Sequence, residues 1–244
     1  MGIEQFAVIT FGALAGGFVS GLAGFGTGIT AISIWLYAVS PPVAASLVVV
    51  CSVISQAQTL PAIWRYIEAK RVFPFILPGV LGVPLGTVLL SHLDTRILKL
   101  AMGSLLLLFS AYMLFGRSCA KTAWGGRIAD GAIGFGGGVL GGLAGLSGPL
   151  PTMWAAIRGW GKHESRAVFQ AFNLTVLSIA LLSHAIAGLL TADVGWALLA
   201  ALPGTITGAW LGAHAYGRLD DRRFRVIILL LLCASGGVLI WKSV

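Results

Sequence analysis

Two short segments of the chain contain the residue types that could bind an anion inside an apolar protein. They are GLAGFGTG at 21–28 and GLAGLSGP at 142–149, so the letters GLAG recur after 121 positions. Both combine glycine, which lets a ligand approach the backbone closely, with one hydroxyl group, on Thr27 or Ser147. A helix that begins after such a break presents free N–H groups and a partial positive charge. These segments therefore predict anion binding without a buried cation.

We expect a new helix to begin after each break, with its first turn pointing into the protein. Thr27 is predicted to cap the first of these helices, and Ser147 or Gly148 the second. Pro149 would stand near the first helical position, where its missing N–H matters least. Glycine at a spacing of four also serves helix packing, and we assign three runs to packing: Gly12/Gly16, Gly134/Gly138/Gly142 and Gly204/Gly208/Gly212.

The next helix in each half supplies polar side chains. An amide is costly against lipid, so we predict that Gln170 and Asn173 face the protein interior, on a helix over 166–190. Gln56 belongs to a polar face in the first half. The candidate binding residues, from the breaks and from these helices, are Gly26, Thr27, Gly28, Ser147, Gly148, Gln56, Gln170 and Asn173.

Two ionisable residues share the face of helix 166–190 with these amides. Arg166 either attracts anions at the cytoplasmic mouth or is an ordinary cytoplasmic cation. His184 either makes a hydrogen bond between helices or carries a proton. Both are candidates for gating or proton transfer, and whether transport is coupled to protons stays open.

Composition places all of these residues in a membrane. Of 244 residues, 57% are hydrophobic and 10% charged, too few charges for a water-soluble surface. Stretches such as 41–64 and 72–91 contain no Asp, Glu, Lys or Arg and exceed the roughly 18 residues typical of a membrane span. The net charge of +8 fits cytoplasmic loops better than nucleic-acid binding, because no basic stretch is interleaved with stacking aromatics. We predict an all-α polytopic membrane protein.

The chain contains an internal duplication beyond the two breaks. LPG recurs at 77–79 and 202–204, and LDTR at 93–96 matches LDDR at 219–222. We predict one transmembrane domain, 1–244, in which each repeat is a glycine-broken helical hairpin plus three transmembrane helices. Its parts are repeat one (5–116), a polar linker (117–127) and repeat two (128–243).

The distribution of Lys and Arg favours hairpins over single crossings at the breaks. If each broken stretch returns to the side it entered from, the 16 Lys and Arg divide thirteen to three between the two sides, as the positive-inside rule requires. A single crossing gives nine to seven, which is no bias. An odd number of full spans then inverts the second repeat relative to the first. Arms at 5–20 and 27–39 are short for a full span, although a ten-span arrangement gives the same charge count.

Several chemistries lack the residues they need. No Asp or Glu falls within the expected spans, so a carboxylate proton relay or a sodium site is not supported. The three cysteines have no CxxC spacing, and we expect no disulfide framework, no metal and no cofactor. The GFGGGVLGG segment at 134–142 does not satisfy GxGxxG, so a nucleotide loop is not predicted.

The segments SGLAGFGTG and GGLAGLSGP, Asn173 ahead of HAIAGLLTADVGW, and the LDTR and LDDR turns together resemble the sulfite exporter TauE/SafE family, also called toluene-sulfonate uptake permeases. The resemblance covers essentially the whole chain. It implies a transporter in the bacterial inner membrane for sulfur-containing anions such as sulfite, sulfonates or sulfoacetate. The substrate and the direction of transport vary among members, so neither is implied.

The predicted function is therefore transport of a small sulfur oxyanion, held near the midplane by two opposed helix N-termini, with alternating access between inverted repeats. Both termini are expected in the periplasm, and the partners are the anion and the lipid bilayer. The Gly204 run could also pack against a second protomer, which leaves a homodimer open. One alternative function is an intramembrane serine protease using Ser147 and His184, which is disfavoured because Gly26 replaces the serine in the first repeat. A second alternative is a membrane scaffold that transports nothing.

Overall fold

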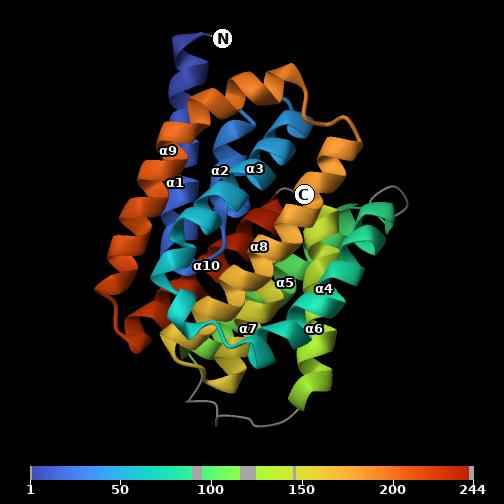
Figure 1. Ribbon diagram of the computed structural model, residues 1–244, viewed down its shortest axis with the longest axis vertical. Helices are drawn as coiled ribbons and strands as arrows, with labels where there is room; N and C mark the ends of the chain where they lie inside the picture. The colour runs from blue at the N-terminus through green and yellow to red at the C-terminus, as the bar shows by residue number, and fades with distance from the viewer. Residues whose placement is uncertain (1, 90–94, 116–124, 145–146, 242–244) are drawn as a thin grey trace.

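The protein is a bundle of helices, as expected (Figure 1). The computed structural model describes residues 2–89, 95–115, 125–144 and 147–241, and every regular element within these ranges is helical. The first half contains α1 (Ile3–Ala23), α2 (Thr27–Trp35), α3 (Pro41–Thr59), η1 (Leu60–Ala62), η2 (Trp64–Tyr66), α4 (Ala69–Leu89) and α5 (Thr95–Phe115). The second contains α6 (Gly126–Ala144), α7 (Pro149–Arg158), α8 (Lys162–Ile186), α9 (Ala192–Gly217) and α10 (Asp221–Trp241). Most of the predicted linker 117–127 lies outside the described residues.

Four described segments are long and apolar enough to cross a membrane: Ile3–Ala23, Pro42–Ala62, Lys162–Ile186 and Ala192–Gly217. Helices α4, α5 and α10 have 21 residues each, which is also a spanning length. The chain is therefore a multi-pass membrane protein.

Each glycine break turns the chain back on itself, as the charge count predicts. In the first half, Trp35 Nε1 donates a hydrogen bond to the Ile9 carbonyl at 2.9 Å, and Gln5 Nε2 donates to the Ala38 carbonyl at 3.5 Å. The start of α1 and the end of α2 thus lie together. In the second half, Trp154 Nε1 near the end of α7 donates to Asp130 Oδ1 near the start of α6 at 2.7 Å. Both broken stretches are antiparallel hairpins.

The arms of these hairpins are unequal, which differs from the expectation of two short arms. α1 has 21 residues, about 32 Å at the rise of an α-helix, whereas α2 has nine. The α6 and α7 arms have 19 and ten residues. Gly16, Gly17 and Gly21 remain helical because neighbouring segments pack against them, so tertiary packing overrides their low helix propensity.

Close approach between helix backbones builds the rest of the bundle. α1 packs along α9, α4 along α6, and α5 along α10, while α3 and α8 contact each other between these pairs (Figure 1). A Cβ added at Gly204, Gly208 or Gly212 of α9 would collide with the backbone of α1. Gly134 and Gly138 of α6 meet the backbone of α4 in the same way. The assignment of these runs to packing is confirmed, and the α9 run is used inside the bundle.

Replacing Gly208 with leucine is expected to force α1 and α9 apart, because a side chain there meets the Leu14 carbonyl. An overpacked site of this kind loses about 1–3 kcal/mol of stability, and thermal unfolding in detergent measures the loss. Gly195→Leu on the same helix is the matched control, since a Cβ at Gly195 has no neighbour within 4 Å. Equal stability of the two variants would contradict this account of the α1–α9 contact.

Candidate functional site

The first helix break is formed by two glycines in left-handed conformations. Gly24 has φ of +80° and ends α1, while Gly26 has φ of +101° and precedes α2. Gly26 is the N-cap residue of α2, so the prediction that Thr27 caps this helix is wrong. Thr27 is instead the first helical residue, and its Oγ1 is buried without a hydrogen-bond partner in the described part of the chain. The sequence does not show that Gly26 adopts a positive φ, and this backbone angle is what places Gly26 at the cap position.

The second break is described from Ser147 onward. Gly148 is the N-cap residue of α7 and Pro149 occupies the first helical turn, both as predicted. Ser147 does not cap the helix, because its Oγ donates to Asn173 Oδ1 at 2.6 Å. In each short helix a threonine of the first turn, Thr30 or Thr152, donates to the carbonyl of the cap glycine.

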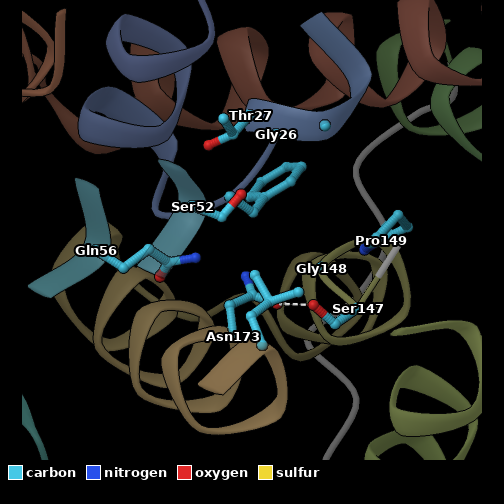
Figure 2. A pocket seen from close by; sticks show the side chains of 11 residues that line it. Gly26, Thr27, Ser52, Gln56, Ser147, Gly148, Pro149 and Asn173 are labelled. Atoms are coloured by element: carbon cyan, nitrogen blue, oxygen red, sulfur yellow. Dashed lines mark hydrogen bonds between the residues drawn. The ribbon is translucent and has the colours of Figure 1, made fainter. Parts of the chain in front are cut away.

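Asn173 of α8 connects the two breaks. Its Oδ1 accepts the hydrogen bond from Ser147 (Figure 2), and its Nδ2 donates to the Gly24 carbonyl at 3.1 Å. Phe25 also lies against Gly148, where an added Cβ would come within 2.8 Å of the Phe25 side chain. The breaks therefore meet in the interior, about one central amide. Asn173 is the single asparagine of the whole sequence.

Two glutamines extend this network toward α3. Gln170 Nε2 donates to the Gln56 carbonyl at 2.7 Å and to Thr59 Oγ1 at 2.9 Å. With its amide oriented so that nitrogen faces the two carbonyls, Gln56 donates to the Gly24 carbonyl at 3.3 Å and the Gln170 carbonyl at 3.2 Å. All three amides are buried, as the cost of an amide against lipid predicts for Gln170 and Asn173.

A small cavity of about 20 Å³ lies between the breaks (Figure 2). Seven of the eight candidate binding residues line it, and the eighth, Gln170, packs beside it through Gln56. Apart from Phe25, the lining residues form five pairs separated by 121 positions: Gly26 with Ser147, Thr27 with Gly148, Gly28 with Pro149, Ser52 with Asn173, and Gln56 with Leu177. The duplicated segments thus supply matching positions of one cavity.

Neutral groups make up the described lining of this cavity. The first backbone N–H of α2 that finds a carbonyl partner in the described chain is that of Thr30, which bonds to Gly26, so earlier N–H groups at the helix start remain free. α7 offers fewer donors because Pro149 and Pro151 have no N–H. The donors therefore come mainly from α2 and from the Thr27 hydroxyl. With no carboxylate among the described lining residues, the cavity favours an anion.

Arg166 and His184 do not line the cavity. His184 lies near the far end of α8, where its Nδ1 is 3.2 Å from Ser46 Oγ on α3. Ser147 bonds to Asn173 instead, so the pair proposed for a serine protease does not meet in this structure. Arg166 is fully buried about two helical turns from Asn173 along α8.

One buried carboxylate escaped the sequence analysis. Asp130 lies in α6, where it accepts the hydrogen bond from Trp154 and pairs with Arg158 Nη2 at 3.2 Å. The group fastens the start of α6 to the end of α7, away from the cavity. Asp130 is four residues inside α6, at the edge of an apolar run, and Trp154 followed by Arg158 was the available signal.

Replacing Asn173 with leucine is expected to destabilise the protein. The buried Ser147 hydroxyl would lose its acceptor, and the Gly24 carbonyl would lose one of its donors. A buried polar group left without a partner costs about 1–3 kcal/mol, which thermal unfolding in detergent would detect. The control is Gln58→Leu, which removes an exposed amide bonded to the Ile206 carbonyl. If Asn173→Leu is no less stable than this control, Asn173 does not hold the breaks together.

The family model described as sulfite exporter TauE/SafE matches residues 8–239, nearly the whole chain. No curated protein and no solved structure gives a significant match.

Proposed function

The chain belongs to the sulfite exporter TauE/SafE family, and from this premise we propose that it carries a small sulfur oxyanion through the cavity between its two helix breaks. The family implies a membrane transporter of sulfur anions. The observation that carries the assignment to this cavity is Thr27. The residue is 2% exposed, lines the cavity at the start of α2, and has a buried hydroxyl without a partner among the described residues.

The chemistry of the lining suits such an anion. Sulfite and sulfonate groups carry three oxygens that accept hydrogen bonds, and free N–H groups of α2, the Thr27 hydroxyl and Ser52 would donate to them. The positive end of the α2 dipole adds roughly half an elementary charge without requiring a buried lysine. Sulfite, sulfoacetate and simple sulfonates are the proposed substrates.

We propose that the two halves are inverted repeats that exchange roles during transport. The packing of α1 on α9 has a counterpart in α6 on α4, as expected if α1 corresponds to α6 and α4 to α9. If α3 likewise corresponds to α8 and α5 to α10, the α3–α8 and α5–α10 contacts are unchanged when the two repeats are exchanged. The common separation of 121 residues between paired lining positions supports the same relation. Alternating access would then follow from movement of the α1–α9 pair relative to the α4–α6 pair about a central site.

Neither rival function gains support from the site. A serine protease needs a base beside Ser147, and that hydroxyl donates to an amide oxygen instead. A scaffold needs no buried hydroxyl held free of partners at a cavity. The Thr27 variant below separates transport from a scaffold role.

The positive-inside count, together with the hairpins, supports a cytoplasmic location for the α7–α8 junction and periplasmic locations for both termini of a protein in the bacterial inner membrane. Alkaline phosphatase fused to the C-terminus should be active, and green fluorescent protein fused there should not fluoresce. Phosphatase inserted at Gly161, between α7 and α8, should be inactive. The reverse pattern would place the termini in the cytoplasm and refute this orientation.

Replacing Thr27 with valine is expected to reduce transport while leaving stability unchanged. The hydroxyl has no partner in the described chain, so its removal breaks no bond there, whereas an anion would lose a donor. A hydrogen bond to a charged group is worth about 1.5–3 kcal/mol, or roughly tenfold or more in affinity. Uptake of radiolabelled sulfite and sulfoacetate into proteoliposomes, with and without a pH gradient, measures the effect.

The matched control is Thr175→Val, since the Thr175 hydroxyl is engaged by the Ala171 carbonyl within α8 and does not line the cavity. If Thr27→Val transports the anions at the wild-type rate, the cavity is not part of the transport path. A wild-type protein that moves no sulfur oxyanion would refute the proposed function itself.

A further inference from the structure

Arg166 is a buried guanidinium without a polar partner. The residue has 0% exposure, and its Nε, Nη1 and Nη2 make no hydrogen bond in the described chain. By contrast, the partly buried Arg158 pairs with Asp130. A guanidinium has five N–H donors and stays charged inside proteins, so leaving all of them unmet is unfavourable. The described conformation therefore leaves the hydrogen-bond donors of this charged group without acceptors.

Aromatic side chains cover the guanidinium. Its central carbon lies 4.0 Å from the centre of the Tyr216 ring, near the end of α9. The Tyr216 hydroxyl is 2.8 Å from His163 Nδ1, and the His163 ring stacks on Tyr66 at 4.2 Å. A cation over an aromatic face gains some attraction, although it gains no hydrogen bond. The Tyr216 ring thus occupies the place where an anion would sit against Arg166.

The other charges near this cover do not neutralise Arg166. Lys162 approaches the Tyr216 ring at 5.2 Å, which adds positive charge. The carboxylate of Asp221 accepts a hydrogen bond from the backbone N–H of Lys162 at 3.2 Å and makes no ion pair with Arg166. The local field therefore favours an anion from outside the chain.

Arg166 also lies on the route from the cavity to the α8 N-terminus. Gln170 and Asn173 follow it on the same face of α8, about 6 and 10 Å further along the helix axis. The turn at Gly24 packs beside Arg166, since a Cβ there would be 3.4 Å from Arg166 Cγ. Only the first break and one helical turn separate the guanidinium from the cavity network.

We infer that Arg166 is a second oxyanion-binding position, between the cavity and the cytoplasmic face, which is uncovered when Tyr216 moves aside. This inference rests on the proposed function and adds a residue that the cavity does not include. A planar guanidinium can donate two parallel hydrogen bonds to two oxygens of one sulfite or sulfonate group. The anion would replace the Tyr216 ring in the conformation open to the cytoplasm and pass to the donors of α2 when that side closes.

The test compares Arg166→Met with the wild type in vesicles of known orientation. Inside-out vesicles expose the cytoplasmic face to radiolabelled sulfite, and right-side-out vesicles expose the other face. Arg166→Met should raise the half-saturating sulfite concentration at the cytoplasmic face about tenfold or more, and leave that of the other face within about twofold. Arg166→Lys retains the positive charge for membrane insertion but loses the two parallel bonds, so we expect a smaller rise at the cytoplasmic face only.

Thermal unfolding of the purified proteins without anion distinguishes binding from a structural role. Removing an unpartnered buried charge should leave the unfolding temperature of Arg166→Met equal to or above that of the wild type. Arg158→Met is the contrasting control, because it leaves Asp130 without its ion pair and should unfold at a lower temperature.

An unfolding temperature of Arg166→Met as low as that of Arg158→Met would identify Arg166 as structural and overturn the inference. Wild-type half-saturation at the cytoplasmic face in both Arg166 variants would also overturn it, while the proposed transport function would stand. If the wild-type protein moves neither sulfite nor sulfoacetate in either vesicle, the proposed function fails, and the inference fails with it.

Discussion

Backbone N–H and C=O groups inside a membrane must find partners within the protein, and this requirement governs how two interrupted helices can exist in the bundle. The Gly24 carbonyl, left open where α1 ends, receives the amides of Asn173 and Gln56. Gln170 meets the Gln56 carbonyl and Thr59. These amides belong to α3 and α8, which explains why polar side chains gather on the two helices that contact each other at the centre. Backbone N–H groups at the start of α2 lie at a cavity of the protein interior instead of against lipid.

Holding such breaks in place requires rigid supports, and the glycine contacts supply them. α1 and α9 touch backbone to backbone, as do α4 and α6, so neither pair can slide without a collision. The short arms are fastened separately, by Trp35 to the carbonyl of Ile9 and by Trp154 to Asp130. Glycine therefore serves two physical purposes in one chain. Along the long helices it permits close packing, and at Gly24 and Gly26 it permits a left-handed backbone.

The sequence was sufficient to predict the hairpins, the positions of the breaks and most of the cavity lining. Those features follow from the charge distribution, the duplicated glycine segments and the cost of burying amides. It could not predict that Thr27 is free and that Ser147 turns toward Asn173, because these depend on backbone angles at Gly26 and on the approach of α8. The length of α1 was underestimated for a related reason, since the partner that stabilises its glycines lies almost 190 residues away. Asp130 was missed because a carboxylate at the edge of an apolar run looks like a loop residue until Arg158 is placed beside it.

The two prolines at the start of α7 make the cavity chemically one-sided. Pro149 and Leu177 present carbon to it where the matching positions of the first half, Gly28 and Gln56, present polar groups. Ser147 and Asn173 are already bonded to each other. Duplication of a segment would by itself yield two equivalent walls, whereas Pro149 and Leu177 make the second wall less polar than the first. Matching positions of the two halves therefore contribute differently, and the hydroxyl without a hydrogen-bond partner in the described lining lies on the α2 side, at Thr27.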